Sequence, residues 1–375
     1  LPVGSTLSGG MDSSSVACMA RVLRGTDAAP LDTFSAIFDT LPQCDERVYM
    51  EAVQAQGGFE PHYLHADRLS PLMELDRVLR HEDEAFFAPN LFMHWALYKL
   101  AREQGVRVFL DGLDGDTTVS HGYERLVELA AAGQWLTLAR HVRAFSRHRK
   151  LSPWRILLRM VLVPLLPLPA RKAWRRATGQ SNSAWQISNP TLRPDFVRRI
   201  GLEERLWTLK GDPLRRPRTN REEHFRRLGW GLCAHALEVA DRAAAAFSLE
   251  PRYPFFDVRL AEYCLALPSE QKMSDGWTRV VLRRAMQNIL PEKVQWRPDK
   301  SNLGPNFRRG FLEDDRAQVE EVVLGDGYGI AEYVDMPALR NAYERCRAKA
   351  SSVDEMMVWR AVSLAVWLAR VDLSA

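Results

Sequence analysis

The sequence predicts an α/β protein built on a doubly wound parallel sheet, with a helical insertion and C-terminal helices. Strand-like and helix-like runs alternate through residues 1–123. A helical, basic stretch follows over 124–225, and residues 311–375 read as closing helices rich in Glu, Arg and Trp. We therefore expect an α/β core over 1–123, an insertion or lid over 124–225, and a helical remainder over 226–375.

The alternation begins with a strand at 2–7, a glycine turn, and a helix over 13–23 whose apolar residues recur at helical spacing. Further strands are expected at 31–38, 62–65 and 106–110, and further helices at 45–56 and 90–104. Such β/α alternation places helices on both faces of a parallel sheet.

Two turns stand at the carboxyl ends of predicted strands, Ser8-Gly9-Gly10 after the first and Asp111-Gly112 after the strand at 106–110. In open α/β sheets ligands gather at the carboxyl ends of the strands. Both turns are therefore expected at a ligand site.

The segment Ser8-Gly9-Gly10-Met11-Asp12-Ser13-Ser14 has the composition of a phosphate-binding loop. Glycines let backbone N–H groups approach an anion, and a helix N-terminus adds unpaired donors. Asp12 would repel a bare phosphate, so its presence indicates Mg²⁺ between carboxylate and phosphates. An ordinary strand-to-helix turn capped by Asp and Ser is the alternative, but the whole string favours ATP chemistry that releases pyrophosphate.

The overall composition is that of a soluble protein: 46% of the 375 residues are hydrophobic, 26% are charged, and the formal net charge is +4. This mild charge gives no indication of nucleic-acid binding. Five dispersed cysteines without CxxC pairs favour a reducing cytoplasm and argue against structural zinc. The longest apolar run, 156–169, is interrupted by Arg159 and three prolines and is shorter than the ~20 residues of a membrane span, so we expect no stable membrane insertion.

The 124–225 stretch concentrates cations and tryptophans. They are Arg147, Arg149, Lys150, Arg155, Arg159, Arg171, Lys172, Arg175, Arg176, Arg215, Arg216 and Arg218, with Trp135, Trp154, Trp174 and Trp185. We expect a solvated helical face with aliphatic anchors, and the alternative is a docking surface for a peptide or an acidic membrane.

Three later segments carry polar groups suited to the same chemistry. The loop after the strand at 106–110 holds Asp111, Asp114 and Asp116 among glycines, and one of these carboxylates would share a metal with Asp12. Further along, Glu238, Asp241 and Arg242 share one helix face. Finally, Lys300 follows a Pro-Asp turn and would neutralise charge as pyrophosphate departs.

In this order, these segments resemble the synthetase domain of the asparagine synthetase family. Residues 8–14 are similar to its SGGxDSS pyrophosphate loop, and residues 111–123 resemble its SGxGxDE…GGY segment. Residues 250–257 match its ExRxPFLD string, and the pairs at 282–283 and 290–291 with residues 297–300 match its LR…LP…R-x-K region. The resemblance runs from residue 1 to about 310 and implies a fold of the adenine-nucleotide pyrophosphatase type.

The resemblance also implies an activity, an ATP- and Mg²⁺-dependent carbon–nitrogen ligase. ATP adenylates a carboxylate, pyrophosphate leaves, and an amine attacks the acyl-adenylate to give an amide and AMP. The matching positions imply three sets of binding residues. Pyrophosphate would be bound by Ser8, Gly9, Gly10, Asp12, Ser13 and Ser14, and Mg²⁺ by Asp12 and Asp116. The adenosine would lie along Leu7, Ile37 and Gly112. Lys300 would steady the negative charge that develops in adenylation and amide formation.

The chain departs from the family pattern in two segments, the loop after the strand at 106–110 and the last motif. Leu113 stands where asparagine synthetases place an acid, Asp111 stands where they place a serine, and the last motif holds one extra residue before Lys300. Relatives that make β-lactams use a Tyr at the position of Leu113, with a Glu from a later helix, to deprotonate the amine. Glu238 resembles that Glu in position, so we expect Glu238, or Asp111 or Asp114, to be the base that deprotonates the amine. A protonated primary amine needs such a base, whereas free ammonia does not.

The region 31–123 looks like lasso-peptide macrolactam cyclases, which join an acidic side chain of a precursor peptide to its N-terminus. A precursor peptide and an associated protease are then the expected partners of a cytoplasmic enzyme. Glutamine-hydrolysing synthesis of asparagine from aspartate is the alternative within the same chemistry, and an inactive nucleotide-binding scaffold is the alternative from another class. The family's N-terminal glutaminase-like domain is expected to be absent from this fragment.

Overall fold

The computed structural model describes residues 1–375 except 26, 87, 213, 350 and 374–375, and the chain forms two compact units. The first contains Leu1–His65, Ala96–Leu166 and Arg216–Ser301, and the second contains Ala66–Trp95, Pro167–Arg215 and Asn302–Ala375. The stretch 124–225 contributes to both units. The division of the chain into 1–123, 124–225 and 226–375, which we expect from the sequence, remains a prediction.

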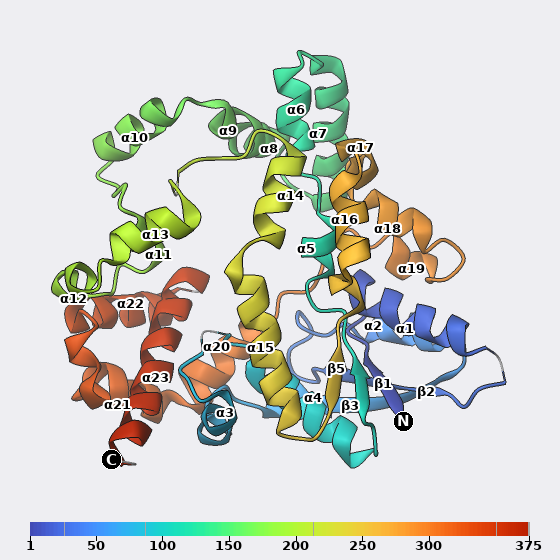
Figure 1. Cartoon of the computed structure of the whole chain (residues 1–375), viewed down its shortest axis with the longest axis horizontal. Helices are drawn as coiled ribbons and strands as arrows, with labels where there is room; N and C mark the ends of the chain where they lie inside the picture. Colours follow the sequence, from blue (N-terminus) through green and yellow to red (C-terminus); the bar gives the residue numbers. More distant parts are fainter. Residues whose placement is uncertain (26, 87, 213, 350, 374–375) are drawn as a thin grey trace. The chain divides into compact units, whose positions relative to one another are not determined.

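The first unit is built on a five-stranded parallel sheet of order β3-β2-β1-β4-β5 (Figure 1). Its strands are β1 (Val3–Thr6), β2 (Leu31–Ile37), β3 (Phe59–His65), β4 (Val108–Leu110) and β5 (Glu250–Arg252). The strand order turns back at β1, whose Ser5 is in register with Leu110 of β4. The carboxyl ends of β1 and β4 are therefore neighbours, which is where ligands bind in such sheets. The predicted α/β class with its parallel sheet is confirmed.

Helices pack on both faces of this sheet. On one face, α1 (Met11–Arg24) and α2 (Arg47–Gln54) bury Leu7 and Ile37 in a cluster with Met50 and Val53. On the other face, Tyr98 of α4 (Leu91–Glu103) packs edge-on against Phe109 at 5.3 Å between ring centroids. Since side chains alternate along a strand, Ile37 and Phe34 of β2 point to opposite faces, and Phe34 meets Phe109.

Two element boundaries differ from the sequence-based expectation. Helix α1 begins at Met11 instead of 13 because Gly10 takes the N-cap position, with its carbonyl accepting from Ser14 N. Strand β3 begins at Phe59 instead of 62, in register with the whole of β2. As an edge strand with several exposed residues, β3 lacks the apolar pattern that marks a buried strand.

The remaining elements of the first unit are helical apart from a small hairpin, β6 (Met273–Ser274) with β7 (Trp277–Thr278). The helices are α5 (Gly115–Val119), α6 (Arg125–Ala131), α7 (Trp135–Arg149), α8 (Pro153–Ile156), the π-helical η2 (Leu157–Leu162), α9 (Val163–Leu165), α14 (Asn220–Leu228), α15 (Gly231–Ala245), η3 (Pro254–Phe256), α16 (Val258–Ala266), α17 (Ser269–Lys272), α18 (Val280–Ala285) and α19 (Glu292–Gln295).

The described part of the second unit is helical, with one isolated bridge between Leu192 and Val334. Its core contains Phe307, Phe311 and Trp359 in mutual ring contact. Its helices are η1 (Ala66–Arg68), α3 (Leu75–Glu82), α10 (Leu168–Ala177), α11 (Ala184–Ser188), α12 (Pro194–Arg199), α13 (Leu202–Lys210), α20 (Gly304–Arg309), the π-helical η4 (Gly310–Asp314), α21 (Arg316–Leu324), η5 (Gly327–Glu332), α22 (Met336–Ala348) and α23 (Ser352–Leu373). No helix in the described ranges combines the length and apolarity needed to cross a bilayer.

Candidate active site

The turn between β1 and α1 is held in shape by its own serines. The Ser8 and Ser13 hydroxyls lie 2.9 Å apart, and Ser8 N donates to Ser13 Oγ at 3.1 Å. Gly9 has a φ of +71°, and a Cβ on it would lie 2.8 Å from Tyr49 Cβ, so a glycine is needed there. No side chain caps α1, whose N-terminus follows directly. The first-turn N–H groups of α1 therefore face the end of β1 as donors for an anion.

Two glycines bring the loop after β4 against this turn. A Cβ on Gly112 would lie 2.5 Å from Ser13 N, and a Cβ on Gly115 would lie 2.9 Å from the Asp12 carboxylate. Gly112 and Gly115 thus allow a backbone approach that any larger residue would prevent. The result is that Asp12 lies against the start of α5, the helix that carries Asp116.

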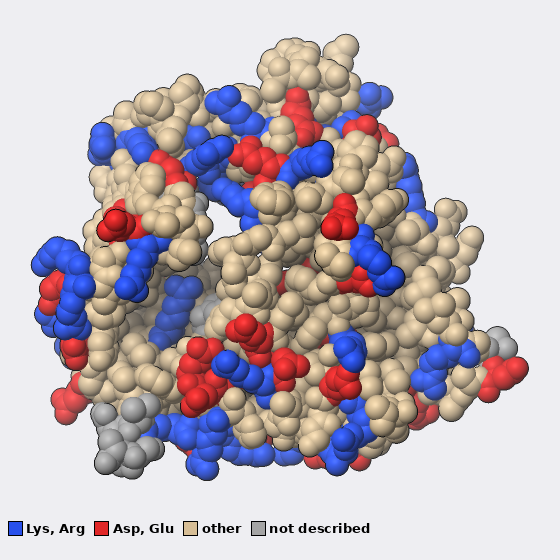
Figure 2. Space-filling view, in the orientation of Figure 1, with Lys and Arg blue, Asp and Glu red and all other residues tan. Residues whose placement is uncertain are grey.

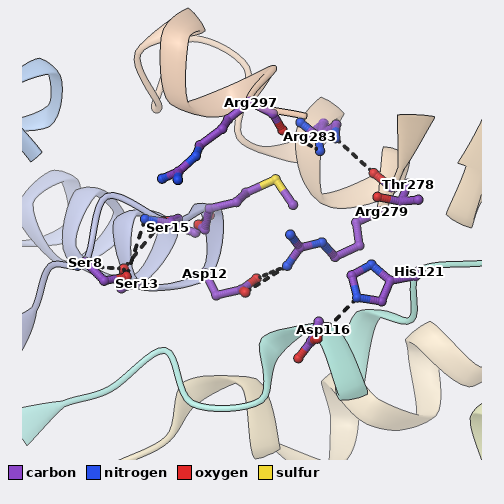
Figure 3. Close-up of polar contacts among 12 residues, drawn as sticks. Ser8, Asp12, Ser13, Ser15, Asp116, His121, Thr278, Arg279, Arg283 and Arg297 are labelled. Carbon is purple, nitrogen blue, oxygen red and sulfur yellow. Dashed lines mark hydrogen bonds and ion pairs between the residues drawn. The ribbon is translucent and has the colours of Figure 1, made fainter. Parts of the chain in front are cut away.

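Each of these two carboxylates faces one cationic or ionisable partner (Figure 3). Arg279 Nη1 lies 2.6 and 2.8 Å from the two oxygens of Asp12. His121 Nε2 lies 3.2 Å from Asp116 Oδ2, and this hydrogen bond is the main reason that the pKa of Asp116 is held well below its ordinary value. The His121 ring stacks on Tyr123 at 4.9 Å between centroids, which fixes its orientation.

A third carboxylate, Asp114, completes a zone of negative charge. Burial raises its pKa above the ordinary value, and the charges of Asp116 and Asp12 raise it further. Repulsion among these carboxylates means that a cation between them would be favoured. The described residues contain no cluster of three or more His, Cys, Asp or Glu side chains arranged as a metal site. Two carboxylates with substrate phosphates are, however, a usual ligand set for Mg²⁺, so Asp12 and Asp116 fit the predicted metal.

The segment carrying Lys300 is tied to the same turn. Arg297 forms a buried ion pair with Glu46 and donates from Nη1 to Gly9 O at 3.1 Å. Ser301 N donates to the same Glu46 carboxylate at 2.9 Å. Lys300, between these anchors, is exposed, and its Cε lies 3.9 Å from where a Cβ on Gly10 would be. The ammonium is therefore carried beside the phosphate turn.

Some predicted site residues lie elsewhere. Leu7 and Ile37 are 0% and 4% exposed in the hydrophobic core, so their side chains do not reach the surface of the site. Asp111 is buried and accepts a hydrogen bond from Thr6 Oγ1 at 3.4 Å, and its charge raises the pKa of the half-buried Tyr253, although burial of the phenol is the larger cause. Ser14 is also fully buried, and its hydroxyl has no hydrogen-bond partner among the residues that the structure describes.

Glu238 lies exposed on α15, as do Asp241 and Arg242, so this polar face is solvated. On the same helix, Cys233 is near enough to the site that the charges of Asp114 and Asp116 add to the effect of burial in raising the pKa of its thiol. Helix α15 thus reaches the acidic loop with its first half. The role of Glu238 as a base stays a prediction.

Two site residues had no role assigned from the sequence. Arg279 stands just before α18 with a φ of +54°, in the N-cap position, and its buried Nε has no hydrogen-bond partner within the described part of the chain. Its position four residues before the second residue of the LR pair is a local signal that could have identified it. Glu46 lies in the region 31–123, where no local signal marks it, and its pairing with Arg297 joins segments that nothing in the local pattern connects.

The comparison with known proteins agrees with this geometry. A family model described as asparagine synthase matches residues 1–369. The chain belongs to the asparagine synthase family. This confirms the family predicted from the four motif segments. Leu113, half-buried between Gly112 and Asp114, is thus a departure within this family, as is Asp111 in the same loop.

Individual members of the asparagine synthase family match shorter stretches. Asparagine synthetase (glutamine-hydrolyzing) 3 of Bacillus subtilis (strain 168) is 36% identical over 93 residues, which are 23% of this chain and 15% of that protein. The asparagine synthetase (glutamine-hydrolyzing) of Rattus norvegicus is 39% identical over 83 residues, 21% of this chain and 15% of that protein. That of Gallus gallus is 40% identical over 65 residues, 16% and 12% of the two chains. The matches thus span about one seventh of the relatives' length or less.

Proposed function

We propose that the protein is an ATP-dependent, AMP-forming amide ligase. The observation that carries the proposal is the meeting of three groups at the carboxyl ends of β1 and β4. These are the glycine turn before α1, the carboxylates Asp12 and Asp116, and the Lys300 segment anchored by Arg297. Donors for phosphate, ligands for a metal and a cation for a leaving group are what pyrophosphate release requires.

In the first step, an oxygen of the substrate carboxylate attacks the α-phosphorus of ATP, and the bond to the β-phosphate oxygen breaks. The turn at 8–14 and the N-terminus of α1 bind the departing pyrophosphate with N–H groups. Asp12 and Asp116 would hold Mg²⁺, which neutralises phosphate charge when bound. Lys300 adds a positive charge beside Gly10 and stabilises the developing negative charge.

In the second step, the amine nitrogen attacks the acyl carbon, the bond to AMP breaks, and the amine loses a proton. A protonated primary amine must lose its proton before it can attack. Glu238, Asp114 and Asp111 are the proposed acceptors, because Leu113 has no group that accepts one. A base of this kind favours an amine larger than ammonia, and we propose the N-terminus of a precursor peptide, as in a lasso-type macrolactam cyclase.

The first experiment measures pyrophosphate release from ATP with the full chain and candidate acids. Asp12→Asn should reduce release by roughly a hundred- to a thousandfold, on the order of what loss of a charge-stabilising group costs in other active sites. Asp326→Asn, an exposed position in the second unit, is the control and should leave release unchanged. If intact, folded protein released no pyrophosphate with any acidic peptide or aspartate, the ligase proposal would be wrong.

A second experiment identifies the acceptor. With an acidic precursor peptide, a cyclase yields a product lighter by one water, and with aspartate and glutamine or ammonia an asparagine synthetase yields asparagine. Glu238→Gln should slow amide formation while leaving pyrophosphate release intact, because it acts only in the second step. Asparagine formation with no reaction on any peptide would reject the cyclase and keep the ligase.

A further inference from the structure

The charge of this chain is distributed very unevenly. Residues 129–194 contain twelve Lys and Arg and no Asp or Glu, although the whole chain has a net charge of only +4. The remainder of the chain is therefore net negative, at −8. The part of this acid-free run that lies in the first unit, 129–166, has seven of the twelve cations. Six of the seven are exposed: Arg140, Arg143, Arg147, Lys150, Arg155 and Arg159.

An exposed apolar stripe runs along the helix formed by α8, η2 and α9. Its members, which we call the outer stripe, are Trp154, Leu158, Leu162 and Leu166, and they are 65%, 43%, 38% and 46% exposed. They recur every fourth residue. Because a π-helical turn holds more residues than an α-helical turn, this spacing keeps the stripe on one side of the mixed helix.

The opposite side of the same helix is apolar as well. Ile156 and Val161 are 3% and 0% exposed and pack with Leu129 of α6 and with Leu138 and Phe145 of α7. That side accounts for the attachment of the helix to the first unit. The outer stripe does not contribute to this attachment, so the helix leaves a second apolar side in water.

The turn between α6 and α7, with the first residues of α7, is a second apolar point in the same acid-free run. Trp135 and Leu136 are 59% and 89% exposed. This turn is uppermost in Figure 1, and Figure 2 shows it bare of charged side chains. Exposed tryptophan and leucine therefore occur at two places in one acid-free segment.

We propose that the outer stripe, with Arg155 and Arg159, docks on the surface of an anionic phospholipid bilayer. Tryptophan and leucine on one side and arginines beside them are the composition of helices that lie in the membrane interface. Arginine stems lie along apolar surface while their guanidinium groups reach phosphate headgroups. The absence of any carboxylate from 129–166 removes the repulsion that an anionic surface would otherwise meet. The helix is too short to span, so the association is peripheral and reversible.

Flotation of the full chain with vesicles tests this proposal. At physiological salt, the protein should float with vesicles of phosphatidylcholine containing one third phosphatidylglycerol and stay behind with pure phosphatidylcholine. The double substitution Leu158→Glu with Leu162→Glu should reduce the bound fraction at least tenfold. Arg155→Gln with Arg159→Gln should reduce it severalfold and weaken its dependence on salt.

The matched control is Leu209→Glu with Val353→Glu. These leucine and valine side chains are 79% and 63% exposed in the second unit, so the control adds the same two charges at exposed apolar positions outside the stripe. It should bind vesicles like the unaltered protein. Thermal unfolding of every variant shows that the comparison is between folded proteins.

Three results would overturn the proposal. In the first, the unaltered protein does not float with anionic vesicles. In the second, the stripe variant and the control variant float equally. In the third, no protein binds vesicles, and sedimentation shows a dimer that is lost only in the stripe variant, so the stripe would be an interface for the acidic surface of a second copy.

Discussion

Glu46 and Arg297 form an ion pair in which each side chain is only 7% exposed. The pair joins α2 to the segment after α19, and each partner also holds one more element of the site. Arg297 donates to Gly9 O, and Glu46 accepts from Ser301 N. The phosphate turn and the lysine segment are thus fixed by one shared contact rather than by two separate ones.

Removing one partner of this pair should strongly destabilise the protein. Glu46→Ala leaves the Arg297 guanidinium buried without its counter-charge, and such changes cost about 3–5 kcal/mol in the free energy of unfolding. Urea unfolding measures the loss. The double change Glu46→Leu with Arg297→Met should recover much of it, because no charge is left buried. Glu60→Ala, at an exposed position of β3, is the control, and a loss for Glu46→Ala below about 1 kcal/mol would contradict the prediction.

A methyl group at Gly112 should disturb the site directly. The Cβ of Gly112→Ala would lie 2.5 Å from Ser13 N, so the loop after β4 must move away from the phosphate turn. We expect a KM for ATP raised at least tenfold, with a loss of about 1–3 kcal/mol in stability. Pyrophosphate exchange kinetics give the KM. Gly231→Ala in α15 meets no atom within 4 Å and should change neither quantity, and equal behaviour of the two variants would rule out the close approach.

Arg279 should contribute to catalysis through Asp12 and the phosphates. Arg279→Gln removes a charge-assisted hydrogen bond, worth about 1.5–3 kcal/mol, so kcat/KM for pyrophosphate exchange should fall roughly ten- to hundredfold. Arg279→Lys should restore part of this activity because it keeps the charge. Arg284→Gln, on the exposed side of the same α18, should have no such effect. Unchanged kinetics of Arg279→Gln would assign the Asp12 contact to structure alone.

Lys272 gives the protein a measurable stability dependence on pH. It is fully buried, its Nζ lies 2.9 Å from His224 Nδ1, and burial lowers its pKa from 10.5 to about 8. Between these values the unfolded chain binds more protons at Lys272 than the folded one, so the contribution of this residue to stability rises with pH from about 8 to 10.5, by at most roughly 3 kcal/mol. Buried cysteines such as Cys18 and Cys346, whose pKa values burial raises, contribute the opposite slope, so the prediction concerns the difference between the unaltered protein and Lys272→Met. Urea midpoints should show the unaltered protein gaining stability relative to Lys272→Met across this range, and a constant or falling difference would contradict the prediction.

The sequence predicts the parts of the site that are made by neighbouring residues. The glycines, Asp12 and the serines of residues 8–14 form one local turn, and their spacing carries the signal. The class of the sheet follows from the alternation of strands and helices. Its edge strand β3 was placed imprecisely because exposed strands lack the apolar pattern.

The parts that the sequence did not predict are made by distant segments. Arg279 and Asp12 are separated by 267 residues, and Arg297 and Glu46 by 251. Such pairs follow from how the helices pack, which no local pattern encodes. Arg283 of the LR string makes shorter-range contacts: it is 2% exposed and donates to the carbonyls of Thr278 and Arg297, so it supports the chain around the site and does not face it.

The place of β5 in the sheet has a consequence for synthesis of the chain. Strand β4 ends at Leu110, and its outer neighbour β5 begins only at Glu250. During translation, the outer edge of β4 therefore stays unpaired while the whole acid-free, arginine-rich run is synthesised. Until Glu250–Arg252 emerges, an unpaired strand edge is accessible to other chains. We expect nascent chains that stop before residue 250 to aggregate, and chains that extend beyond α19 to become resistant to protease.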